Sequence, residues 1–207
     1  MKKWFFLYIY FAIEINCVFA QEKSATTHPV WEFNAAASFF FIPDDFFVLP
    51  VLMADKNKLH LEARYNYEDK ETFSAWIGYN FLGGNDFEFA ITPMIGGVVG
   101  LSNGMAPGIK ITLGFKGFEL YSEAEQYFDL ETSDNHFFYM WTDLTYSPND
   151  WLWFGLSGQR TRVYQTDLDI QRGLLIGAGH KNWQLTAYFY NIASDDPFLM
   201  ISLAKGF

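Results

Sequence analysis

The chain has 207 residues, a formal net charge of −10, an aromatic content of 20% and one cysteine. Nucleic-acid binding requires a basic surface, so this acidic chain is not expected to have a nucleic-acid partner. The single Cys17 excludes an intrachain disulfide and a metal site built from several cysteines.

The first residues have the composition of a secretory signal peptide. Two lysines are followed by the apolar run "WFFLYIYFAI" and then by "VFA", which offers suitable residues for the −3 and −1 positions of a cleavage site. We therefore predict that residues 1–20 are removed on export and that residues 21–207 form one domain. An uncleaved anchor, for which the apolar run is short, and a lipoprotein signal at Cys17 remain alternatives.

Beyond this segment the dominant pattern is an alternation of apolar and polar residues, typical of β-strands with two different faces. The clearest example is "KLHLEARYNYED", residues 58–69. Its apolar face consists of Leu59, Leu61, Ala63, Tyr65 and Tyr67. Its polar face consists of His60, Glu62, Arg64, Asn66 and Glu68. A soluble sheet turns the apolar face to a core, whereas a membrane barrel turns it to lipid and keeps polar residues in the lumen.

Twelve such strands follow one another along the chain. They are residues 30–41, 47–54, 58–68, 72–81, 86–97, 107–115, 117–128, 136–146, 151–162, 170–179, 182–192 and 197–207. Their connections alternate between longer, more acidic loops, such as "DLETSDN", and tight turns, such as "KG". Outer-membrane barrels show the same asymmetry, with short periplasmic turns and longer outer loops. An even number of strands places both termini at the end that carries the tight turns.

Aromatic residues flank these tight turns, as in the girdle that marks a membrane interface. The chain ends in "PFLMISLAKGF", which resembles the terminal strand of bacterial outer-membrane barrels, and that resemblance implies recognition of Phe207 by the barrel-assembly machinery. The segments "FIPDDFFVLP", "HLEARYNYE" and "YQTDLDIQRG" resemble uncharacterised outer-membrane proteins of Bacteroidetes type. We predict an all-β fold, an antiparallel up-and-down transmembrane β-barrel of about 12 strands in the bacterial outer membrane, after a cleaved signal peptide.

In this barrel the apolar face of residues 58–69 is predicted to contact lipid, and the polar face to line the lumen. The predicted lumen-lining residues are His60, Glu62, Arg64, Glu88, Lys110, Glu119, Tyr121, Glu123, Glu125, Trp141 and Asp143. The tight "KG" turn places Lys110 opposite Glu123, and the next loop places Glu123 near Trp141. Acids outnumber bases among these residues, so the lumen is either hydrated or partly protonated.

Two functions remain open for such a barrel. The first is a narrow porin-like channel for small solutes, cationic or ring-shaped, with an acidic and aromatic lumen. The second is a closed structural or surface-interaction barrel, whose acidic outer loops contact lipopolysaccharide or another partner. A soluble secreted barrel would also fit the alternation.

A third possibility is a lipid-modifying enzyme of the outer leaflet. A nucleophile and its base must lie within hydrogen-bond reach, and the predicted pairing of strands places Ser74 far from His60. The other histidines lie outside the predicted lumen, with His136 beside an outer loop. We therefore predict that the protein is not an enzyme and has no catalytic residue, metal site or cofactor.

Overall fold

The computed structural model describes residues 30–43, 45–161, 169–194 and 196–207. The predicted signal peptide, residues 1–20, lies outside the described residues. Over the described ranges, no helix is both long enough and apolar enough to cross a membrane.

The described chain consists of β-strands with one short 3-10 helix, η2 (Ser133–Asn135). The strands are β1 (Glu32–Ile42), β2 (Asp45–Lys56), β3 (Leu59–Tyr65), β4 (Thr72–Tyr79), β5 (Phe81–Gly84), β6 (Phe87–Gly100), β7 (Gly104–Phe115), β8 (Phe118–Asp129), β9 (Phe137–Asn149), β10 (Leu152–Thr161), β11 (Asp169–His180), β12 (Trp183–Tyr190) and β13 (Phe198–Gly206).

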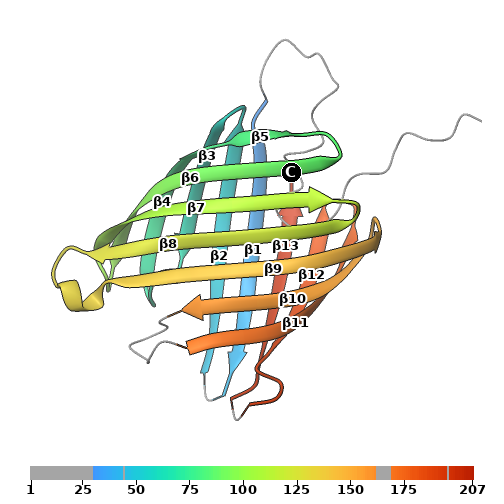
Figure 1. The fold of residues 1–207 in the computed structure, drawn as a ribbon. Coiled ribbons are helices and arrows are strands. Elements are labelled where there is room, and N and C mark those ends of the chain that lie inside the picture. The colour runs from blue at the N-terminus through green and yellow to red at the C-terminus, as the bar shows by residue number, and fades with distance from the viewer. Residues whose placement is uncertain (1–29, 44, 162–168, 195) are drawn as a thin grey trace, which may run out of the picture.

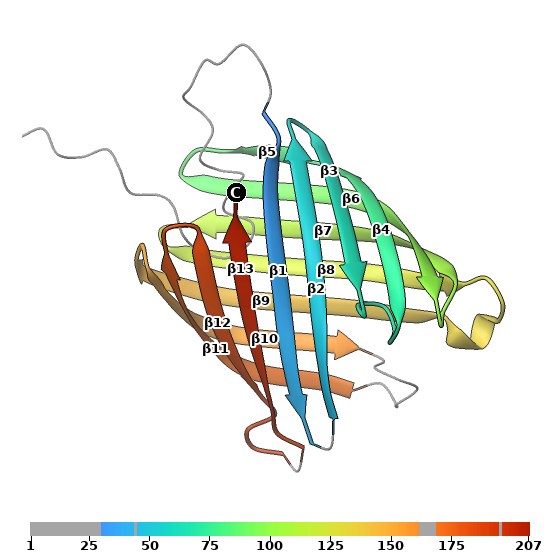
Figure 2. The ribbon, with the colours of Figure 1, turned by 180° about the vertical axis from the view of Figure 1, so that it is seen from behind.

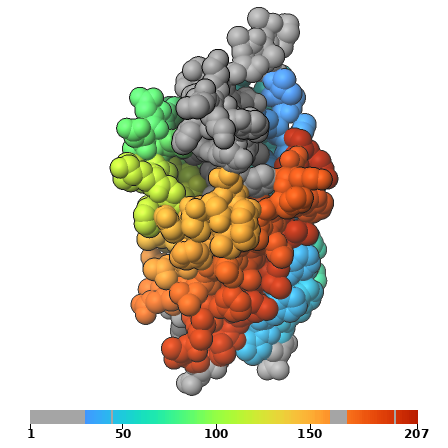
Figure 3. All heavy atoms as spheres, turned by 90° about the vertical axis from the view of Figure 1, so that its right-hand side faces the viewer, coloured from blue at the N-terminus to red at the C-terminus, as the bar shows by residue number. Residues whose placement is uncertain are grey.

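The strands form one closed antiparallel barrel (Figures 1 and 2). β1 pairs with both β2 and β13, and the pairing of β4 with β6 closes the ring. β4 and β5 together form one wall strand, because both pair with β6 in the same register, with Asn80 between them. The twelve-stranded antiparallel barrel predicted from the sequence is therefore confirmed. In Figure 3 the red C-terminal strands lie directly beside the blue N-terminal strands, as the β1–β13 pairing requires.

The wall of the barrel is apolar outside and largely polar inside. Large apolar side chains such as Ile77, Leu156 and Leu174 are about half exposed on the outer surface, at 53%, 56% and 52%. On the strand β3, His60, Glu62 and Arg64 are instead buried in the interior. This is the reverse of a soluble sheet protein, and it is the arrangement expected of a barrel that spans a lipid bilayer.

The prediction that Tyr67 faces lipid is wrong. β3 ends at Tyr65, and Asn66 has a positive φ of 57°, a conformation in which asparagine is enriched. The alternation therefore ends at Asn66, and the following loop turns inward. The Tyr67 hydroxyl donates to Glu123 Oε1 over 2.9 Å, and Glu68 is buried as well.

Glycines opposite tryptophans allow indole rings to lie flat against the inner wall. Gly96 pairs with Trp76, and a Cβ at Gly96 would lie 2.4 Å from the indole. Gly177 has the same relation to Trp153, at 2.1 Å. Real Cβ atoms do not approach other atoms so closely, so a larger residue at either position must displace the ring.

We expect Gly96→Val to lower the free energy of unfolding by about 1–3 kcal/mol, because the new side chain overpacks the interior. Urea unfolding of the refolded barrel in lipid vesicles would measure this loss. Gly97→Val is the matched control, since Gly97 is on the outer face and its added Cβ meets no atom within 4 Å. Equal losses for the two variants would contradict the proposed packing of Trp76.

Candidate functional site

The interior of the barrel holds a cavity of about 80 Å³ between two unlike walls. One wall carries ionisable and aromatic side chains from β3, β7, β8 and β9 and from the loop after β3. These residues are Glu62, Arg64, Tyr67, Lys110, Tyr121, Glu123, Trp141 and Asp143. The opposite wall, from β1, β12 and β13, includes the small side chains Ala36, Ser38, Thr186, Ser202 and Ala204. Space therefore remains where small residues face large ones.

Arg64 is the centre of the ionisable wall, and its side chain is almost completely buried, with 2% of the residue exposed. Its Nε donates to Glu62 Oε2 over 2.7 Å. Its Nη1 donates to Glu125 Oε2, and its Nη2 lies by Glu123 Oε1, each at 3.0 Å. Because burial of a charge without partners is costly, these three carboxylates are what allows an arginine in this position.

Two aromatic rings enclose the same guanidinium group. Its central carbon lies 4.3 Å from the ring centroid of Tyr67 and 4.5 Å from that of Trp76. The indole Nε1 of Trp76 donates to Glu68 Oε1 over 3.1 Å and to Ser74 Oγ over 3.0 Å, which holds the ring in place. Flat cation–π stacking of this kind is a property of arginine rather than lysine.

The network continues toward the tight-turn end of the barrel. Glu62 contacts Lys110 Nζ, and its Oε1 lies 2.6 Å from His60 Nε2. The other ring nitrogen of His60 lies 2.8 Å from Asp55 Oδ1. Lys110 pairs with Glu123 across β7 and β8, the register that the "KG" turn predicts. Glu123 in turn lies opposite Trp141, so both registers expected from the sequence are present.

Asp143 forms a second polar centre, on the cavity side of β9. Its Oδ1 accepts from Trp141 Nε1 over 2.7 Å and from Ser157 Oγ over 2.5 Å. Its Oδ2 accepts from the Tyr188 hydroxyl over 3.1 Å. The Ser157 oxygen also lies 2.7 Å from the Tyr190 hydroxyl, so a chain of hydrogen bonds leads to the carboxylate.

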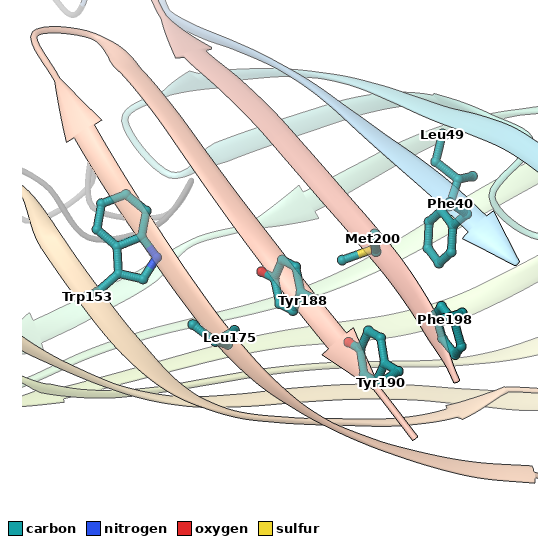
Figure 4. Packing of buried hydrophobic residues seen from close by; sticks show 8 residues of the cluster. All are labelled: Phe40, Leu49, Trp153, Leu175, Tyr188, Tyr190, Phe198 and Met200. Atoms are coloured by element: carbon teal, nitrogen blue, oxygen red, sulfur yellow. The ribbon is translucent and has the colours of Figure 1, made fainter. Parts of the chain in front are cut away.

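Apolar clusters fill part of the interior, and the larger one extends from the end that carries the longer loops to Trp153 near a tight turn. Figure 4 shows the larger one, in which Phe40, Tyr190 and Phe198 lie close to the loop ends of their strands. The rings of Tyr190 and Phe198 stack with centroids 4.8 Å apart, and Phe40 stacks on Phe47 at 4.6 Å. A smaller cluster consists of Trp76, Met94, Val98, Ala106 and Tyr127. The cavity is therefore narrow and is bounded by aromatic side chains toward the loops.

The structure places the eleven predicted lumen residues on the inner face, but in different surroundings. Those that line the cavity are Glu62, Arg64, Lys110, Tyr121, Glu123, Trp141 and Asp143. His60 and Glu125 are buried beside it, and Glu119 is buried nearer the "KG" turn. Glu88, close to the tight turn before β6, is partly exposed.

Sequence reasoning missed Tyr67 as an interior residue, whereas Glu68 belongs to the polar face that was predicted to line the lumen and is buried. Tyr67 follows the last residue of β3, where the period-two pattern no longer assigns faces. The signal that could have located the change was Asn66 followed by the polar "EDK" sequence, since asparagine accepts the left-handed conformation found there.

The described hydrogen bonds do not join a histidine to a serine. His60 contacts Asp55 and Glu62, whereas Ser74, which pairs with Arg64, donates to Glu68 Oε1. His136 Nε2 lies 3.2 Å from the backbone oxygen of Asp129 at the outer loop. The described residues therefore show no hydrogen bond of the serine–histidine type by which a base activates a nucleophile.

No protein-family model and no curated protein sequence matches the chain. Solved structures do match its fold. The KdgM porin superimposes with a TM-score of 0.58 at 13% identity, covering 84% of this chain and 99% of that one. The KdgM porin in complex with disordered oligogalacturonate gives a TM-score of 0.62 at the same identity and coverage.

The outer membrane protein Omp33 of Acinetobacter baumannii also matches, with a TM-score of 0.51 at 10% identity. This match covers 86% of the present chain and 98% of Omp33. None of these comparisons supports the narrower resemblance to proteins of Bacteroidetes type. The closed ring of strands, the apolar outer wall and these matches agree, and the chain therefore has the porin-like fold of the bacterial outer-membrane β-barrels.

Proposed function

We propose that the protein is a narrow porin-like channel of the outer membrane, which passes small cationic or neutral ring-shaped solutes by diffusion. The observation that carries this proposal is the cavity inside the barrel, which separates a charged wall from a wall that includes several small side chains. A barrel that serves only as a scaffold can fill its interior completely, as small barrels do. Here Ala36, Ser202 and Ala204 leave room beside Arg64 and Glu123.

The charge of the interior supports a preference for cations. The buried acids of the inner wall include Glu62, Glu68, Glu119, Glu123, Glu125 and Asp143. The bases that face them are Arg64 and Lys110, with His60 at the edge. Fixed negative charge in a narrow low-dielectric passage attracts cations and repels anions. A polyanion such as the oligogalacturonate bound by the KdgM porin is therefore a poor ligand for this interior.

Planar-bilayer recording of refolded residues 21–207 in a salt gradient tests the channel. We expect small discrete current steps and a cation-selective reversal potential. Glu123→Gln should lower the cation-to-anion permeability ratio by about two-fold, because it removes one negative charge from the cavity wall. Glu71→Gln, in an exposed outer loop, is the matched control and should leave the ratio unchanged. A silent bilayer with insertion shown independently would contradict the proposal.

A closed surface-interaction barrel is the second candidate, and the two apolar clusters favour it. In that case the outer loops would be the functional part. Asp45 and Lys70 join two of these loops through an ion pair of 2.5 Å. Acidic loop residues would then contact lipopolysaccharide, and vesicles with and without lipopolysaccharide would distinguish this role from transport.

Recognition of the C-terminal strand by the barrel-assembly machinery is also a proposal. Phe207 is 68% exposed, and its backbone nitrogen donates to the Phe33 oxygen over 2.9 Å. The ring is thus accessible to a partner while the backbone is already fixed to β1.

A further inference from the structure

Asp143 differs from the acids around Arg64 in what compensates its charge. Glu62, Glu123 and Glu125 each have a guanidinium nitrogen within 3.0 Å. Asp143 is equally buried, at 2% exposure, yet none of the ion pairs within 4.0 Å among the described residues involves it. A buried carboxylate without a cationic partner is costly unless hydrogen bonds or a bound cation compensate it.

The hydrogen bonds of Asp143 leave one position open. Among the residues that the structure describes, Trp141 and Ser157 both donate to Oδ1, whereas Oδ2 accepts only from Tyr188. A carboxylate offers about four lone-pair positions, so Oδ2 retains one that an N–H donor can use. The donors also fix the orientation of the carboxylate before any ligand arrives, which lowers the entropic cost of binding.

The surroundings of the carboxylate suit a small cation with an apolar end. Asp143, Trp141 and Tyr188 all line the cavity. The two rings meet edge to face, at 80° and 5.5 Å between centroids, and they form an aromatic corner beside the acid. Aromatic faces attract a cation through the ring quadrupole and also pack against short alkyl groups. Ser38 and Ser202 on the opposite wall leave space for such a group.

A second acid lies on the same side of the interior. Glu119 lies on β8 opposite Thr145, two residues along from the pair of Tyr121 and Asp143. Glu119 Oε1 and Thr145 Oγ1 are buried without a hydrogen-bond partner among the described atoms. Unpaired buried acceptors are rare and call for an explanation such as an ion or water. A cation that enters from the tight-turn end would meet Glu119 before it reaches Asp143.

We propose that the cavity is a binding site for a small primary ammonium compound, whose N–H donates to Asp143 Oδ2 while its short alkyl group packs against Trp141 and Tyr188. This inference rests on the proposed function, since it names the class of solute that the channel would pass. A quaternary ammonium lacks the N–H that the open position of Oδ2 requires. The cavity of about 80 Å³ restricts the compound to a few heavy atoms.

Calorimetric titration of the refolded barrel in detergent micelles tests the site. Ethylammonium is the probe, with ethanol as the neutral match and acetate as the anionic match. We expect saturable binding of ethylammonium alone, and at least a tenfold weaker affinity in Asp143→Asn. Asp134→Asn is the matched control, because Asp134 is exposed within η2 in the outer loop, and this variant should bind ethylammonium as the wild type does.

Binding that is equally strong in Asp143→Asn would overturn the site. If Asp143→Asn fails to fold, the titrations of the wild-type protein still test the site. Ethanol or acetate that binds the wild type as tightly as ethylammonium would also overturn the proposal. The outcome is separable from that of the bilayer recording. Binding of ethylammonium without conductance would support the binding site and contradict the channel. Conductance without selective binding of ethylammonium would support the channel and contradict the binding site.

Discussion

Replacing Arg64 by methionine is expected to lower the free energy of unfolding by about 3–5 kcal/mol. Methionine approximates the length of the side chain but removes its charge. Glu62 keeps Lys110 and His60 as partners, whereas Glu125 loses the one cation that contacts it among the described residues. The cost therefore arises from carboxylates left uncompensated in the interior, more than from lost packing.

Two further variants separate these causes. Arg64→Met combined with Glu123→Gln and Glu125→Gln removes the uncompensated charges, and we expect it to regain more than about half of the lost stability. Arg172→Met is the matched control: Arg172 is exposed near the loop end of β11, and its loss should cost no more than about 0.5 kcal/mol. Urea unfolding in vesicles measures all three. A combined variant as unstable as Arg64→Met alone would contradict the electrostatic explanation and would assign the loss to packing.

The architecture of this barrel could be predicted because each transmembrane strand has one face toward lipid and one toward the polar interior, and its sequence alternates accordingly. The alternation in residues 58–65 assigns each side chain to lipid or interior, and the structure keeps that assignment throughout β3. Turn length supplied the register: "KG" between β7 and β8 leaves only one close pairing, which joins Lys110 to Glu123. Strands, turns and strand pairing can therefore be predicted from local sequence patterns, even when the packing of the interior is unknown.

The contents of the interior could not be predicted in the same way. Which acids meet Arg64 depends on contacts across the barrel, such as the one from β3 to Glu125 on β8, and period-two patterns carry no information on them. Tyr67 was assigned to lipid because one left-handed residue, Asn66, ended the pattern. The apolar cluster was likewise hidden, since alternation places Phe40 and Phe41 on opposite faces but does not show that Phe40 packs with Tyr190 and Phe198.

Removing the rings of Phe40 and Phe198 is expected to raise single-channel conductance several-fold if the apolar cluster closes the passage. Both side chains are buried, at 6% and 8% exposure, and both lie near the loop ends of their strands. Truncation to alanine removes most of the volume of each ring, and water can enter the space because Tyr190 and Ser157 provide polar partners beside it. The expected cost in stability is about 3–5 kcal/mol per ring, so folding has to be verified for the variant.

The same change on the outer face is the control for this experiment. Phe41 and Phe189 are 44% and 42% exposed on the outer face. The double variant Phe41→Ala, Phe189→Ala therefore also removes two phenyl rings but does not open the interior. Bilayer recording should show an unchanged current for this pair and a larger current for Phe40→Ala, Phe198→Ala. Equal currents from the two double variants would mean that the cluster is not the barrier. The restriction would then lie deeper, at the guanidinium group of Arg64, where the ring of Tyr67 and the carboxylate of Glu123 meet.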